Sequence, residues 1–175
     1  LPAGPGGEPV MTIVVSPLAG ARACFQRKTP THVVSLLSPG MAPPAWPRRD
    51  LARLHLVFND IVAPREGLIL PAAEHMNAFL QFLEGWDRRS ALMIHCSAGV
   101  SRSTAAAYVA ACLRDGPGCE DTLAQNLRAA APFASPNARL VALADEALQR
   151  DGRMTAAILA IGRGAETKTG AVFEI

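Results

Sequence analysis

The chain alternates between two patterns of hydrophobic and polar positions along most of its length. Short apolar runs rich in β-branched residues are typical of strands, and longer segments with apolar residues every three or four positions are typical of helices. Strands separated by helices predict an α/β fold with a mostly parallel central sheet flanked by helices. The expected strands are residues 10–15, 32–37, 53–58 and 91–95, and the expected helices are 17–28, 71–86, 103–115, 120–131, 136–150 and 153–161.

The two ends of the chain differ in character from the middle. Residues 1–9 are rich in Pro and Gly and are interpreted as a linker or an artificially added segment, with Met11 as a candidate natural start. No internal repeat and no interdomain linker interrupts the remainder. Residues 10–175 are therefore predicted to form a single domain.

Composition narrows the class of protein. Half of the residues are hydrophobic and 18% are charged, which indicates a globular chain. The net charge is +2 and no run of Lys and Arg forms an arm, so neither a nucleic acid nor a membrane is an expected partner. The 4 cysteines are too few for a disulfide framework, which favours a reduced, cytoplasmic location. Since the histidines lack ligand-type spacing to the cysteines, no metal is expected.

The segment after the strand at residues 91–95 carries the candidate chemistry. It reads His95-Cys96-Ser97-Ala98-Gly99-Val100-Ser101-Arg102-Ser103 and then enters an apolar helix. In open parallel sheets ligands bind beyond the carboxyl ends of the strands, and Cys96 lies at one such end. A loop that enters a helix points several N–H groups inward and can cradle phosphate oxygens. The expected substrate-binding residues are Ser97, Ala98, Gly99, Val100, Ser101 and Arg102.

Each side chain of this segment has an expected role. The positive potential of the loop favours the thiolate form of Cys96, the candidate nucleophile. Arg102 offers a planar fork of donors for two phosphate oxygens, and Gly99 supplies the backbone freedom of a tight concave loop. Ser103 is expected to donate to the sulfur when it becomes a leaving group. His95 is expected to hold the loop or the sulfur environment by hydrogen bonds without touching substrate.

A simpler interpretation makes Cys96 a small buried residue, Arg102 a solvated cation and Ser103 a helix cap. A cysteine with an arginine six positions later arises easily by chance in this composition. That interpretation leaves the joint presence of His95, Gly99 and Ser103 unexplained. The full constellation is therefore what favours phosphate chemistry.

The run from His95 to Ser103 resembles the signature of the cysteine-dependent protein tyrosine phosphatase superfamily, nearest to its small dual-specificity-like members. Phe58-Asn59-Asp60, followed by the expected helix at 71–86, is similar to the segment that carries this family's general acid. Ser135-Pro136-Asn137 resembles the family's Pro-Asn helix start. The resemblance covers about residues 10–150, and residues after 151 match nothing in it. It implies a phosphatase domain with a parallel-rich sheet and no cofactor.

Loss of a phosphoester leaving group needs a proton, so an acid should reach over the loop. Asp60 is the first candidate because it follows a strand end and lies 36 residues before Cys96, near the family's spacing. Glu66 is the competitor and Asp50 is third. Asp60 also fits a turn-initiating residue after a strand.

These residues predict a phosphatase that hydrolyses phosphomonoesters through a phosphocysteine intermediate, with a phosphoprotein or a small phosphomonoester as substrate. The loop carries no Lys, which favours phosphotyrosine in proteins over highly charged phosphoinositides. Dual specificity stays open because no segment for gripping a phosphotyrosine ring is recognisable. Two other classes stay open as well, a phosphate-binding module without turnover and a rhodanese-like sulfurtransferase. The oligomeric state and the natural substrate do not follow from the sequence.

Overall fold

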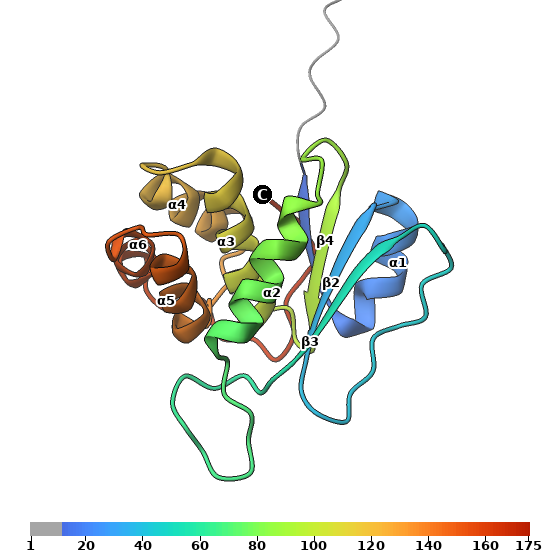
Figure 1. The fold of residues 1–175 in the computed structure, drawn as a ribbon, viewed down its shortest axis with the longest axis horizontal. Coiled ribbons are helices and arrows are strands. Elements are labelled where there is room, and N and C mark those ends of the chain that lie inside the picture. Colours follow the sequence, from blue (N-terminus) through green and yellow to red (C-terminus); the bar gives the residue numbers. More distant parts are fainter. Residues whose placement is uncertain (1–11) are drawn as a thin grey trace, which may run out of the picture.

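The structure of the chain is a computed structural model that describes residues 12–175 (Figure 1). The interpretation of residues 1–9, the candidate start at Met11 and the first positions of the strand expected at 10–15 lie outside these residues. The strands are β1 (Ile13–Pro17), β2 (His32–Leu37), β3 (Ala52–Val57), β4 (Leu92–Cys96) and β5 (Phe173–Glu174). The helices are α1 (Leu18–Lys28), α2 (Ala73–Glu84), α3 (Arg102–Asp115), α4 (Glu120–Ala130), α5 (Ala138–Ala147) and α6 (Arg153–Ile161).

The strands form one sheet in the order β3-β2-β4-β1-β5. The first four strands are parallel, and β5 runs antiparallel to β1. Cys96, the last residue of β4, lies opposite Pro17 of β1 and Leu36 of β2. The carboxyl ends of three strands therefore meet around Cys96, at the lower edge of the sheet in Figure 1. The prediction of a mostly parallel α/β sheet is confirmed.

Helices cover both faces of this sheet (Figure 1). On one face, α1 and Trp46 pack against Val14, Val33 and Met93. The other face carries the larger core, to which α2 to α6 contribute. Successive side chains of a strand point to opposite faces of the sheet. Alternate residues of the buried strands therefore belong to the two different cores. All helices and strands expected within the described residues are present, with ends shifted by a few residues.

The chain after α6 contains the one strand that the sequence pattern does not predict. Residues 162–175, hereafter the C-terminal segment, run past the lower end of the sheet and then along β1 (Figure 1). Ile175 exchanges two backbone hydrogen bonds with Ile13, which pairs β5 with β1. A two-residue strand is too short to show a period, so tertiary pairing alone defines it.

Candidate active site

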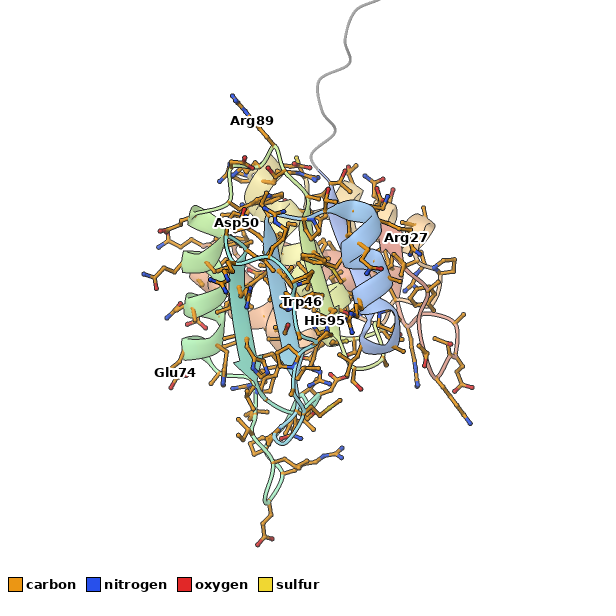
Figure 2. All side chains as sticks on the ribbon, turned by 90° about the vertical axis from the view of Figure 1, so that its right-hand side faces the viewer. Arg27, Trp46, Asp50, Glu74, Arg89 and His95 are labelled. Carbon is orange, nitrogen blue, oxygen red and sulfur yellow. The ribbon has the colours of Figure 1, made fainter. Side chains whose placement is uncertain are left out.

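Strand β4 places Cys96 and His95 on opposite faces of the sheet. Cys96 is 2% exposed and belongs to the larger core, whereas His95 lies beside Trp46 on the α1 face (Figure 2). The His95 ring contacts Ser35 Oγ of β2 through Nε2 at 2.7 Å. Burial lowers the pKa of His95 to about 4, although the adjacent Cys96 backbone group opposes the shift, so the ring is neutral near pH 7. His95 Nε2 thus ties β4 to β2 through Ser35, on the face of the sheet opposite the Cys96 side chain.

Residues 97–102 are hereafter called the anion loop. Four of their backbone carbonyl groups are hydrogen-bonded to the surrounding structure. A peptide unit points its N–H away from its C=O, so a carbonyl anchored outside turns the next N–H inward. Gly99 shows the result directly, because its N–H donates to Cys96 Sγ at 3.2 Å. The anchors are Leu18 N on Ser97 O (3.1 Å), Gly170 N on Ala98 O (2.8 Å), Ser135 N on Val100 O (2.9 Å) and Asn137 N on Ser101 O (3.2 Å).

Gly99 is required for two reasons. Its φ of 72° lies in the left-handed region, which is costly for residues with a Cβ. A Cβ at this position would also lie 2.8 Å from Pro17 N and 3.1 Å from Pro17 Cα. These are backbone atoms at the end of β1, so they cannot move aside as a side chain would. The anion loop therefore sits against β1 at a distance that only glycine allows.

We expect Gly99→Ala to weaken binding of tungstate or vanadate by roughly tenfold or more, because left-handed strain alone costs about 1–2 kcal/mol. Titration calorimetry with tungstate, together with thermal unfolding, measures the effect. The matched control is Gly152→Ala, which has a φ of 79° and no atom within 4 Å of the added Cβ. Equal oxyanion affinity in both variants would show that the contact with Pro17 does not shape the loop.

The sulfur of Cys96 has two donors within reach. Ser103 Oγ lies 3.1 Å from Sγ, in addition to the Gly99 N–H. Such donors stabilise a thiolate more than a neutral thiol. Burial raises the pKa of the Cys24 thiol and raises that of Cys112 to about 12, so these two thiols are protonated near pH 7. The structure thus brings Ser103 to the place where the sequence predicts it.

Arg102 is a buried cation without an acidic partner among the described residues. It is 4% exposed, and Nη1 donates to Phe58 O at 2.8 Å and to Ser38 Oγ at 3.1 Å. Its buried Nε has no hydrogen-bond partner in residues 12–175. By contrast, buried Arg150 pairs with Glu120 at 2.8 Å. A buried charge left unpaired is costly, so the free edge of the Arg102 guanidinium points to an anionic ligand.

The contacts of Arg102 with Phe58 and Ser38 cannot be recognised from the sequence. The Phe58 contact uses a backbone carbonyl, which every residue has, and Ser38 lies in a segment that reads only as a turn. Together they fix one nitrogen of the Arg102 guanidinium. Its remaining donors are left for a ligand.

Asp60 lies at the rim of the anion loop. Its Oδ1 accepts hydrogen bonds from Ser101 Oγ at 2.7 Å and from Asn137 Nδ2 at 2.8 Å. Asn137 is buried, and its Oδ1 accepts from the first amides of α5, Arg139 N and Leu140 N. The Pro-Asn helix start therefore has a second use, because the amide that caps α5 also holds the candidate acid.

The other two acidic candidates lie elsewhere. Glu66 is exposed in the long loop between β3 and α2, and no hydrogen bond joins it to the anion loop. Asp50 pairs with Arg48 at 2.6 Å, and that hydrogen bond holds the pKa of Asp50 below its usual range. Asp50 precedes β3, so it lies toward the opposite end of the sheet from Cys96 (Figure 2). The structure excludes Asp50 as the acid at this loop.

Among residues 12–175, no group of three or more His, Cys, Asp and Glu side chains is arranged to hold a metal ion. In the same residues, no helix is both long enough and apolar enough to cross a bilayer.

Comparison with known proteins places the fold. No family model and no curated protein matches the sequence. Among solved structures, human DUSP28 is 20% identical, covering 78% of this chain and 91% of its own, with a TM-score of 0.57. Tk-PTP in the active form is 21% identical, covering 79% and 90%, with a TM-score of 0.57. PTPMT1 in complex with PI(5)P is 15% identical, covering 86% and 94%, with a TM-score of 0.57.

These likenesses define the class by its fold. The chain has the fold of the protein tyrosine phosphatase superfamily, in the small form found in dual-specificity phosphatases. The fold that the sequence resemblance implies is thereby confirmed. These structures are 15–21% identical to this chain. The chemistry of the chain therefore has to be inferred from the residues of its own site.

Proposed function

We propose that this chain is a cysteine-dependent phosphatase that hydrolyses phosphomonoesters, with phosphotyrosine in proteins as the first substrate class. The observation that carries the proposal is the buried Arg102 guanidinium, whose Nε has no hydrogen-bond partner and which has no acidic partner in residues 12–175, at one end of a loop that begins next to Cys96. An amide cradle, a cation with a free edge and a sulfur with two donors form a set suited to a phosphate dianion.

In the first step the Cys96 thiolate attacks phosphorus, and the bond from phosphorus to the ester oxygen breaks. The anion-loop amides and Arg102 stabilise the equatorial oxygens as charge redistributes. Asp60 gives its proton to the leaving oxygen, which departs as the alcohol or phenol. The product on the enzyme is a phosphocysteine.

In the second step water attacks the phosphorus of the phosphocysteine. Asp60, now a carboxylate, takes the proton from this water. The bond from sulfur to phosphorus breaks, and inorganic phosphate forms. The departing Cys96 thiolate accepts hydrogen bonds from Ser103 Oγ and Gly99 N, the two donors already placed around Sγ.

The choice of a phosphoprotein substrate comes from the side chains of the anion loop. Ala98 and Val100 are apolar, and Ser97 and Ser101 are neutral. One structural neighbour, PTPMT1, is known with PI(5)P bound, so a phospholipid headgroup is the competing class. A headgroup with several phosphates needs several cations, and the anion loop supplies Arg102 alone.

The test is hydrolysis of an aryl phosphate in the presence of a metal chelator, run beside a thiosulfate:cyanide sulfur-transfer assay. We expect phosphate release that the chelator leaves unchanged, and no thiocyanate. Tungstate binding without phosphate release would identify a phosphate-binding module. Thiocyanate formation would identify a rhodanese-like sulfurtransferase and would contradict the proposal.

A further inference from the structure

The C-terminal segment forms one wall of a cleft beside the anion loop. Val100 and Ser101 of the loop line one side of this cleft, and residues 163–168 line the other. Its volume is about 530 Å³, within the usual range for small-ligand sites. Ser101 also contacts Asp60, so the cleft opens next to the candidate acid.

This wall is anchored to the loops around the site. Gly164 N donates to Ser135 Oγ at 3.1 Å, and Ala165 N donates to Pro132 O at 2.9 Å. Gly170 N donates to Ala98 O at 2.8 Å, on the anion loop itself. Residues 163–168 therefore lie between fixed points at both ends.

Two glycines permit this close approach. A Cβ at Gly164 would lie 2.5 Å from the backbone of Phe133 and Ala134. A Cβ at Gly170 would lie 2.5 Å from the Phe133 ring and 2.8 Å from Gly99 O. The wall is thus packed directly against the segments that surround the anion loop, and its side chains project from a defined backbone.

The charged side chains of the wall are free to bind a ligand. Arg163, Glu166 and Lys168 are exposed and line the cleft. Neither Arg163 nor Lys168 makes an ion pair with any residue that the structure describes. Two cations and one carboxylate give the cleft a net positive charge. This charge favours binding of one anionic group of modest charge.

We propose that this cleft is a recognition subsite for a second anionic group on the substrate, with Arg163 and Lys168 as the residues that determine specificity. The subsite rests on the proposed function, because it binds a group of the substrate next to the phosphate that Cys96 and Arg102 hold. The ligand chemistry is an acidic side chain or a second phosphate within a few residues of the phosphorylated one. Glu166 also lines the cleft, and its negative charge disfavours a polyphosphorylated headgroup and favours a peptide.

The test compares kcat/KM for five substrates: a small aryl phosphate, a phosphotyrosyl peptide with neutral neighbours, the same peptide with Asp nearby, the same peptide with phosphoserine nearby, and a soluble inositol phosphate. We expect the wild type to prefer the acidic peptides by roughly tenfold, since two exposed cations can each form a modest ion pair with the added anionic group. Separate Asp and phosphoserine arms show which source of the anion the cleft reads.

Arg163→Ala combined with Lys168→Ala should remove this preference and leave aryl phosphate hydrolysis unchanged. Glu166→Gln should increase the preference. The matched control is Arg27→Ala combined with Arg89→Ala, which removes the same charge from exposed positions away from the cleft (Figure 2). That control should keep the preference.

The outcomes separate the two proposals. Failure of the wild type to hydrolyse any of the five substrates would overturn the proposed function and the subsite with it. Hydrolysis of the aryl phosphate with equal rates on all peptides would overturn the subsite alone. A wild type that prefers a soluble inositol phosphate to both acidic peptides would replace the peptide subsite with a headgroup site.

Discussion

Cys96→Ser is expected to lower aryl phosphate hydrolysis by roughly 10⁴-fold or more, which is typical for removal of a catalytic nucleophile. The variant should still bind tungstate, because the carbonyl anchors of the anion loop and the contacts of the Arg102 guanidinium do not involve the sulfur. Steady-state assays measure the first effect, and calorimetric titration measures the second. A serine hydroxyl is a far weaker nucleophile than a thiolate at neutral pH, which separates binding from turnover.

Cys119→Ser is the matched control, because Cys119 lies at the start of α4, away from the anion loop. It should behave like the wild type in both measurements. Substantial turnover by Cys96→Ser would contradict the phosphocysteine mechanism. Loss of tungstate binding in that variant would show instead that the sulfur shapes the loop.

Asp60→Asn is expected to slow hydrolysis of phosphotyrosine and alkyl phosphates by about 10²–10⁴-fold, the usual contribution of a general acid. The loss should be much smaller in the first step for an ester of a strongly acidic phenol, since that phenolate departs without a proton. Rates plotted against the acidity of the leaving group measure the effect.

Glu66→Gln is the comparison variant, since Glu66 is the other acidic candidate in the same loop. The hydrogen bonds to Asp60 from Ser101 and Asn137 predict that Glu66→Gln keeps the activity of the wild type. If Glu66→Gln loses activity on poor leaving groups while Asp60→Asn does not, the assignment of the acid is wrong. If both variants match the wild type, the proton comes from neither carboxylate.

The sequence pattern predicts the layers of this fold well because parallel strands and amphipathic helices leave a periodic signal. It also predicts which segment forms the anion loop, because a strand end, Gly99 and a helix start lie next to one another in the chain. The Arg102 anchors on Phe58 and Ser38 cannot be predicted in this way, since they join positions 44 and 64 residues apart. They depend on the order of strands in the sheet, which no local pattern records.

His95 and Asn137 illustrate the same limit on side-chain roles. The position of His95 next to Cys96 suggests a partner in the loop, yet alternation along β4 turns the ring to the opposite face and onto Ser35. Asn137 reads as a helix cap, and it is one, but the contact with Asp60 spans 77 residues. Helix capping joins residues close together in the sequence and can therefore be predicted from it. The contact between Asn137 and Asp60 joins distant positions and cannot.

The four carbonyl anchors of the anion loop tie its conformation to completion of the fold. Their donors come from the start of α1, the segment before α5 and the C-terminal segment, so contacts far apart in the chain must all close before the amides face inward. Such nonlocal closures are slow and come late in folding. A growing or partly folded chain can hold its sheet and still lack an oxyanion cradle. A chain that ends before residue 170 lacks the donor to Ala98 O, so it forms its sheet with one of these four anchors missing.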